Sequence, residues 1–577
     1  MANLIWNLDD LFKSKKDCYH EIKKITKQVD KLNKIKVNDS FSLFNLLEKA
    51  WQIKEVTNNI LIYGSFKYYK DVNNEDTIKL KEKVENFNNE TNYKLQFVDN
   101  IILDFGNDKI NEMYQENKKL EKYKLYIDNL FRKKEHLIKS DELINNNNLI
   151  NKYLTDYNKL LHNMQFNNIV VDNEKIDLNI TNYSKYLNSK NRDIRKQTFI
   201  NVDSAYKEKA KEYFTILDNI YSLRIKNIKL EKYNSVLEKV LFEEKIDLKI
   251  VDNLILSVNN HLFLIQNYLK IKSNKLEIEK PHLYDFGVNL SENIPKYSLE
   301  DAIKIIKESL KPLGDEYLKA VDILLDGHID ASFDNKKHQS ITFSWNTYSF
   351  LNYKGTYNDL KNLIHELGHI VNYYLSKQNQ PFIYEDSTIF VGEIASITNE
   401  ILLNRYLYNN AKTKEEKIFY LSKEIENYFT TVFKQTLYTE LELRLYILKD
   451  NNRLTSNNIS NIYYNLIKRY YGNQVAYDSL AKYEWMRLGH LYRYAFYPYK
   501  YATGLMLASI VVNGILDNTI KLDSYITFLK SGSSKYSLDL LKDLGINLSN
   551  LNIFNKGFNI LKEDIEKLEE LLEKDYV

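Results

Sequence analysis

The sequence has little cysteine, proline or glycine. Its 577 residues include one cysteine, Cys18, together with 5 prolines and 15 glycines. A single cysteine excludes both an internal disulfide and a metal site built from several cysteines. Folds made of many short strands need frequent turns, and turns draw on glycine and proline. The low counts therefore favour long helices over a β-sandwich or a β-barrel.

Long apolar runs and an excess of charge are also missing. We find no apolar stretch of about 18 residues, as a membrane-spanning helix needs, and no apolar signal-peptide core at the start of the chain. The formal net charge is +3, and lysine-rich stretches such as Lys79–Glu85 are interleaved with acidic residues. This balance gives no electrostatic basis for binding nucleic acid. We therefore expect a cytoplasmic protein without nucleic-acid or membrane partners.

The residues that are present fit a soluble, folded and predominantly α-helical protein. Hydrophobic residues make up 44% and charged residues 28% of the chain, which is typical of globular proteins. Apolar residues recur at intervals of three and four, as at Leu43, Leu46, Leu47 and Ala50, and this spacing predicts amphipathic helices. The chain is too long for one ordinary core, so we expect at least two lobes or one large helical assembly.

One segment has a different pattern. Ser340–Tyr353, SITFSWNTYSFLNY, is rich in β-branched and aromatic residues that roughly alternate with polar ones. This pattern predicts one or two strands. We therefore expect a small sheet next to the helix that follows.

Two helices are expected after these strands. The pair Lys354-Gly355 predicts a turn, and Thr356 with Asp359 resembles a capping box at a helix start. We expect the first helix from about Tyr357 to Leu375 and the second from about Thr388 to Leu407.

The first of these helices carries the motif H-E-x-x-H, as His365, Glu366 and His369. Residues four apart lie on one face of a helix, so two imidazoles can bind the same Zn²⁺. Glu366 can then act as a general base toward water without being a ligand. The alternative is a pair of ordinary core histidines. However, the surrounding residues are apolar, and burying these polar groups without a metal or other partners is costly.

A third ligand should come from a carboxylate, because no third histidine follows at a suitable spacing. Glu393 and Glu400 are seven residues apart and share a face of the second predicted helix. Glu385 and Asp386 precede that helix in a loop.

The residues around the motif resemble a known family. The segment 352–400, NYKGTYNDLKNLIHELGHIVNYYLSKQNQPFIYEDSTIFVGEIASITNE, is similar to the zinc-binding core of oligoendopeptidase F, a relative of thimet oligopeptidase. The family's third ligand is the glutamate of a block like 390–396, FVGEIAS, which implies that Glu393 binds the metal. Glu400 matches a second family glutamate, whose implied role is to support a ligand histidine.

A second segment, 490–504 (HLYRYAFYPYKYATG), resembles the family's histidine- and tyrosine-rich segment. The resemblance implies that His490 and Tyr501 donate hydrogen bonds to the substrate carbonyl oxygen and stabilise the oxyanion that forms there. Tyr494 and Tyr497 are further candidates for substrate contact.

The resemblance extends over nearly the whole chain, including 6–12, 186–241 and 297–321. It implies a zinc metalloendopeptidase that hydrolyses short unfolded peptides, with one Zn²⁺ per chain. It also implies two helical lobes around a deep substrate cleft. We expect an N-terminal helical region over residues 1–195 and a catalytic region over residues 196–577.

One segment departs from the family pattern. The stretch 334–345, DNKKHQSITFSW, contains no glycine where the family has a Gly- and Ser-rich loop beside the cleft. Two alternatives to the endopeptidase stay open. The protein could be a peptidyl-dipeptidase or carboxypeptidase of the same type, or a catalytically impaired homologue that binds peptides.

Overall fold

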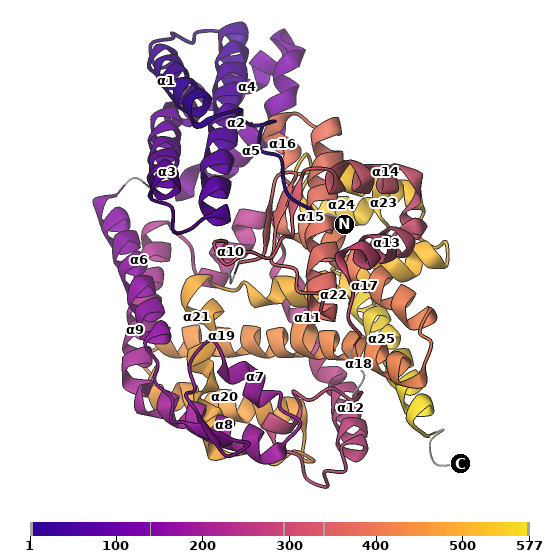
Figure 1. Cartoon of the computed structure of the whole chain (residues 1–577). Coiled ribbons are helices and arrows are strands. Elements are labelled where there is room, and N and C mark those ends of the chain that lie inside the picture. The colour runs from indigo at the N-terminus through magenta and orange to yellow at the C-terminus, as the bar shows by residue number, and fades with distance from the viewer. Residues whose placement is uncertain (1–3, 139, 292–294, 339–340, 574–577) are drawn as a thin grey trace. The chain divides into compact units, whose positions relative to one another are not determined.

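The computed structural model describes residues 4–138, 140–291, 295–338 and 341–573. Of these, 73% are helical and the sheets are small, which confirms the predicted fold class. The chain forms two compact units, each assembled from three separate stretches (Figure 1). Unit 1 comprises Met1–Glu135, Pro295–Leu403 and Gly514–Gly545, and unit 2 comprises His136–Ile294, Asn404–Asn513 and Ile546–Val577. The expected boundary between residues 195 and 196 concerns the extent of the catalytic region and stays a prediction.

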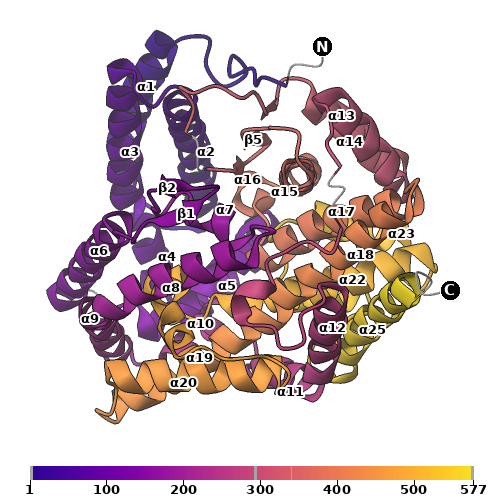
Figure 2. The ribbon, with the colours of Figure 1, turned by 60° about the horizontal axis from the view of Figure 1, so that its bottom comes forward.

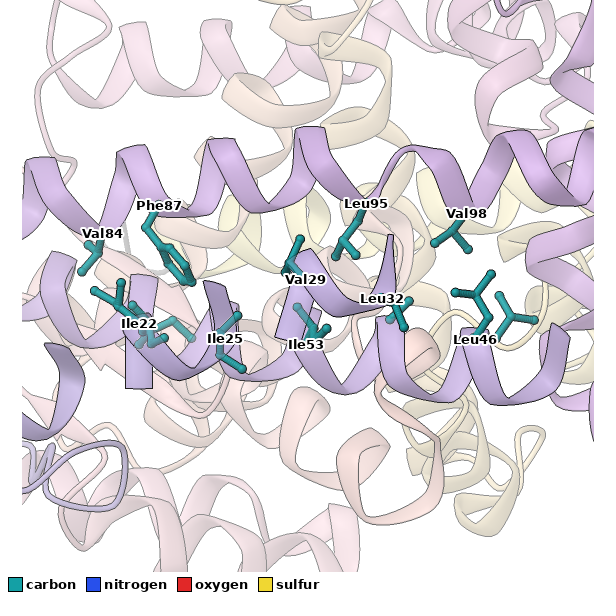
Figure 3. Packing of buried hydrophobic residues seen from close by; sticks show 14 of the residues in the cluster. Ile22, Ile25, Val29, Leu32, Leu46, Ile53, Val84, Phe87, Leu95 and Val98 are labelled. Carbon is teal, nitrogen blue, oxygen red and sulfur yellow. The ribbon is translucent and has the colours of Figure 1, made fainter. Parts of the chain in front are cut away.

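Unit 1 begins with four packed helices: α1 (Lys15–Leu32), α2 (Ser40–Lys70), α3 (Glu75–Leu95) and α4 (Phe97–Glu116). The side chains of Ser14 and Asp39 accept hydrogen bonds from the first backbone amides of α1 and α2, which fixes where these helices start. Their apolar faces meet in one core, in which Ile22 and Val29 of α1 lie near Phe87 and Leu95 of α3 (Figure 3).

The rest of unit 1 carries a small sheet and the helices around it. Its elements are α5 (Lys124–Lys133), α13 (Leu299–Ser309), α14 (Gly314–Leu325), β3 (Ile329–Asp330), β4 (Phe343–Trp345), β5 (Tyr348–Phe350), α15 (Tyr357–Asn379), α16 (Phe382–Glu385), α23 (Leu522–Lys530) and α24 (Ser537–Asp543). A further helix, α17 (Ile389–Asn409), starts in unit 1.

The sheet of unit 1 has the order β3-β5-β4, with β3 parallel and β4 antiparallel to β5. Both β4 and β5 lie within the segment predicted to form strands, and Asn346 between them adopts the left-handed conformation with φ 54°. The aromatic side chains of β4 and β5 pack on Phe66 and Tyr69 of α2, with ring centroids 5.0–6.3 Å apart. Trp6 stacks on Phe66 at 4.5 Å. The sheet is therefore anchored in the core of the first four helices.

Unit 2 is also helical, apart from one hairpin that the sequence analysis did not predict. Strands β1 (Ile169–Val171) and β2 (Glu174–Ile176) pair antiparallel across Asp172 and Asn173, which both have positive φ. The helices are α6 (Asp141–His162), α7 (Tyr183–Leu187), α8 (Arg192–Glu208), α9 (Ala210–Leu230), α10 (Val236–Glu244), α11 (Leu248–Asn260), α12 (Leu262–Lys275), α18 (Lys414–Tyr428), α19 (Lys434–Asp450), α20 (Ser456–Tyr471), α21 (Gly489–Arg493) and α25 (Asn552–Glu573) (Figure 2). A further helix, α22 (Pro498–Leu516), starts in unit 2.

Contrary to the expectation that no apolar stretch reaches this length, one helix within the described residues, α22, is long and apolar enough to cross a membrane by length and composition. The bent pair α11 and α12 passes the same test if it is taken as one span. In α22, however, 83% of the apolar window is buried inside the protein. Burial of this kind is what a core helix of a globular protein shows.

Candidate metal centre

The helix that carries the H-E-x-x-H motif is fixed at its start and along its length. Thr356 Oγ1 accepts a hydrogen bond from the Asp359 amide (3.1 Å), and Asp359 Oδ2 accepts one from the Thr356 amide (2.9 Å). This confirms the predicted capping box. The helix runs from Tyr357 to Asn379, one turn longer than expected. The apolar residues around the motif are fully buried, namely Leu363, Ile364, Leu367, Ile370 and Val371.

A glycine lets α17 pass close to this helix. A Cβ atom on Gly368 would lie 2.6 Å from Ser396 Cα and 3.1 Å from the Ala395 carbonyl oxygen, and real Cβ atoms do not approach backbone that closely. Gly368 therefore makes room for the backbone of α17 beside the H-E-x-x-H motif. Asn399 strengthens the crossing, because its amide donates to the Ile364 carbonyl at 3.3 Å.

The crossing brings three possible ligands together. His365 Nε2 and His369 Nε2 lie 3.1 Å apart, and ligand atoms of these two residues and Glu393 all lie within 4.8 Å of one another. Two nitrogens that bind one tetrahedral zinc at about 2.0–2.1 Å would be roughly 3.3 Å apart. The donor set and the nitrogen spacing therefore fit one zinc ion.

The other carboxylates considered from the sequence lie differently. Glu400 Oε1 is hydrogen-bonded to His365 Nδ1, the ring nitrogen that faces away from His369, and Glu400 Oε2 pairs with Lys361 Nζ at 3.0 Å. Glu385 instead accepts a hydrogen bond from Tyr373 (2.8 Å). Neither Glu385 nor Asp386 belongs to the ligand group found among the described residues.

The charges around the two histidines set where a proton resides. Burial raises the pKa of Glu400, but Lys361 and His365 outweigh it and lower that pKa to about 2. Burial lowers the pKa of His365, yet the Glu400 carboxylate outweighs burial and raises it to about 9. Burial and the neighbouring His365 lower the pKa of His369 to about 3. In the metal-free protein near pH 7, the two facing Nε2 atoms therefore share one proton.

Glu366 lies on α15 next to His365, but different groups surround its side chain. Its side chain is almost fully buried, and burial raises its pKa. Ser344 on β4 donates a hydrogen bond to Glu366 Oε2. Sequence analysis did not single out Ser344. The only signal for it is its position between two aromatic residues in a predicted strand.

The glycine-free segment 334–345 is held in place by a buried lysine. Lys337 Nζ pairs with Asp330 Oδ1 of β3 (2.9 Å) and donates to the Leu351 carbonyl (2.8 Å). Both charged side chains are buried. Within this segment, residues 339–340 lie outside the described residues.

The predicted oxyanion donors form a cluster of their own in unit 2. The ring of His490 lies 5.8 Å from that of Tyr497 and 5.7 Å from that of Tyr501, measured between centroids. Burial and Arg493 lower the pKa of His490, so its imidazole is neutral near pH 7. The ring of Tyr494 lies 5.6 Å from that of Tyr497, and Tyr494 is 59% exposed.

The backbone of that segment contains a left-handed residue that sequence analysis missed. Phe496 has φ 50°, a conformation that a bulky residue rarely adopts. Its amide donates to Glu442 Oε2 of α19 (3.0 Å). Burial raises the pKa of Glu442 to about 8. The geometry between His490 and Tyr501 thus depends on a buried carboxyl group.

Comparison with known proteins gives consistent matches over the whole chain. The model of peptidase family M3 matches residues 185–560. The oligopeptidase PepF of Bacillus subtilis is 28% identical over 99% of this chain and 87% of its own length, and an oligoendopeptidase F homolog of Borreliella burgdorferi is 30% identical over 98% of each. Oligoendopeptidase-F from Enterococcus faecium has a TM-score of 0.74 at 25% identity, covering 98% of this chain and 100% of that one.

Proposed function

Because the chain belongs to peptidase family M3 and is a metallopeptidase of the oligoendopeptidase F type, we propose that it is a zinc-dependent endopeptidase for short, unfolded peptides. The observation that carries the proposal is the convergence of His365, His369 and Glu393 within 4.8 Å beside the buried Glu366. Catalytic zinc sites use three protein ligands of this kind. We assign these residues as the ligands of one Zn²⁺ per chain.

A zinc ion bound there would polarise the scissile carbonyl and make water acidic enough to attack near neutral pH. Glu366 is the general base: it takes a proton from the attacking water and passes it to the leaving amine nitrogen. Glu400 holds the His365 ring through Nδ1, so that Nε2 faces the metal position.

His490 and Tyr501 have a second role in this proposal. Each donates a hydrogen bond to the carbonyl oxygen as it gains negative charge. A neutral imidazole is a suitable donor, and burial lowers the pKa of His490. Tyr497 and Tyr494 are assigned to substrate contact.

We also propose that the substrates are free peptides in the cytoplasm, and that neither nucleic acid nor a membrane is a partner. The net charge of +3 agrees with this. Residues 196–577 remain our proposal for the catalytic region, and the family match over 185–560 supports it.

The test of this proposal is Glu366→Gln. This change keeps the size of the side chain but removes the base, so zinc content should stay at the wild-type level while turnover falls by at least about 100-fold. Glu385→Gln, at another buried glutamate of unit 1, is the matched control and should keep its activity. Full activity of Glu366→Gln would refute the mechanism. Internal cleavage of a C-terminally amidated peptide would in addition exclude the exopeptidase alternative.

A further inference from the structure

The sheet next to α15 presents two serines on one face. In the β4–β5 pairing, Ser344 lies directly opposite Ser349, and both are flanked by aromatic residues. Successive side chains of a strand point to opposite faces. The aromatic neighbours pack on α2, which leaves the two serines on the face toward α15.

These serines form a chain of hydrogen bonds that ends at Glu366. Ser344 Oγ is hydrogen-bonded to Glu366 Oε2 and lies 2.8 Å from Ser349 Oγ. A carboxylate can only accept, and a hydroxyl has one proton to donate. Donation from Ser344 to Glu366 therefore makes Ser344 the acceptor for Ser349, which is fully buried. Both hydroxyl oxygens also lie near the Glu366 carbonyl oxygen, Ser344 Oγ at 3.2 Å and Ser349 Oγ at 3.5 Å, so the serine pair contacts both the side chain and the backbone of Glu366.

We propose that Ser344 is a positioning residue for the general base, with Ser349 fixing the Ser344 hydroxyl in turn. This inference rests on the proposed function of Glu366. The Ser344 bond holds Oε2 and leaves the other carboxylate oxygen to take the proton from water. A glutamate has several rotatable bonds, and fixing them before the reaction removes an entropic cost from the catalytic step.

The anchoring of β4 does not depend on this hydrogen bond. Phe343 and Trp345, on either side of Ser344, contact Phe66 of the helical core at 5.6 and 6.3 Å between ring centroids. Loss of the hydroxyl should therefore leave the sheet in place and release only the Glu366 side chain. The Ser344 hydroxyl contacts Glu366, which is not one of the three proposed ligands, so zinc should bind as before.

The experiment compares Ser344→Ala, Ser344→Thr and Ser349→Ala in the full-length, zinc-loaded protein. Ser309→Ala is the matched control, because Ser309 is also a buried serine of unit 1, with its hydroxyl on the Ile306 carbonyl (2.9 Å). Peptide cleavage gives kcat and KM, a competing chelator gives zinc affinity, and thermal unfolding reports folding.

We expect Ser344→Ala to lower kcat by about 10–100-fold, the order of loss for a misplaced catalytic group, at unchanged KM and zinc affinity. Ser344→Thr, which keeps the hydroxyl, should recover most of kcat, and Ser349→Ala should show a smaller loss. Wild-type kcat in Ser344→Ala overturns the inference, as does an equal loss in Ser309→Ala. If Ser344→Ala does not fold, the test falls to Ser349→Ala, and a wild-type kcat in that variant overturns the inference. A zinc-loaded wild type that cuts no peptide overturns the proposed function as well.

Discussion

Zinc binding should depend strongly on pH, because zinc and a proton compete for the same nitrogen. In the metal-free protein the Glu400 carboxylate raises the pKa of His365 to about 9. Near pH 7, two units below that value, only about one molecule in a hundred has the His365 nitrogen free, which weakens zinc binding by about 3 kcal/mol. Apparent zinc affinity should therefore rise about 100-fold between pH 6 and pH 8 and level off above pH 9. Glu393, whose pKa is raised by burial, acts in the same direction at the acid end.

The assay is titration of the metal-free protein with zinc against a chromophoric chelator, corrected for protonation of the chelator. Glu400→Gln supplies the internal comparison. It removes the charge that raises the His365 pKa, so the rise in affinity above pH 7 should be lost. Affinity at high pH should also fall by about 10–100-fold, as on loss of a partner that orients a ligand. An affinity that does not change with pH in the wild-type protein would show that no proton competes with zinc at His365.

Three further changes test other parts of the structure. Gly368→Ala places a methyl group against the Ser396 backbone and should lower the free energy of unfolding by about 1–3 kcal/mol, together with zinc affinity. Lys337→Ala leaves the buried Asp330 carboxylate without its cation and should cost about 3–5 kcal/mol in urea unfolding; a loss below about 1 kcal/mol, as at an exposed pair, would contradict this. Tyr501→Phe should lower kcat more than it raises KM in steady-state cleavage, and a change in KM alone would remove it from the oxyanion role.

Local patterns predicted the helix that carries the H-E-x-x-H motif well. The capping box of Thr356 and Asp359 depends on neighbouring residues only, and so does the placement of His365 and His369 on one helix face. The choice between Glu393 and Glu400 could not be made from spacing, because both lie on the same face of α17. It depends on where α17 crosses Gly368, which is a tertiary contact.

Other structural features depend on contacts between distant residues and were not predicted from the sequence. The two-residue turn of the β1–β2 hairpin is formed by Asp172 and Asn173, which both adopt positive φ. Asp and Asn favour such a turn. The strands on either side are only three residues long, however, and give too short a pattern to predict a hairpin. The hydrogen bond from Ser344 to Glu366 follows from the register of β4 on β5, which the sequence does not state. Each unit is assembled from three separate stretches of the chain, so no single position in the sequence separates one unit from the other.

The most direct test of the proposed function measures zinc content and peptide cleavage on the same purified protein. An internally quenched peptide of about eight residues would be offered with and without chelator. We expect one zinc per chain and internal cleavage that stops with the chelator and returns when zinc is restored. A protein that binds no zinc after reloading, or whose cleavage is indifferent to the chelator, would contradict it.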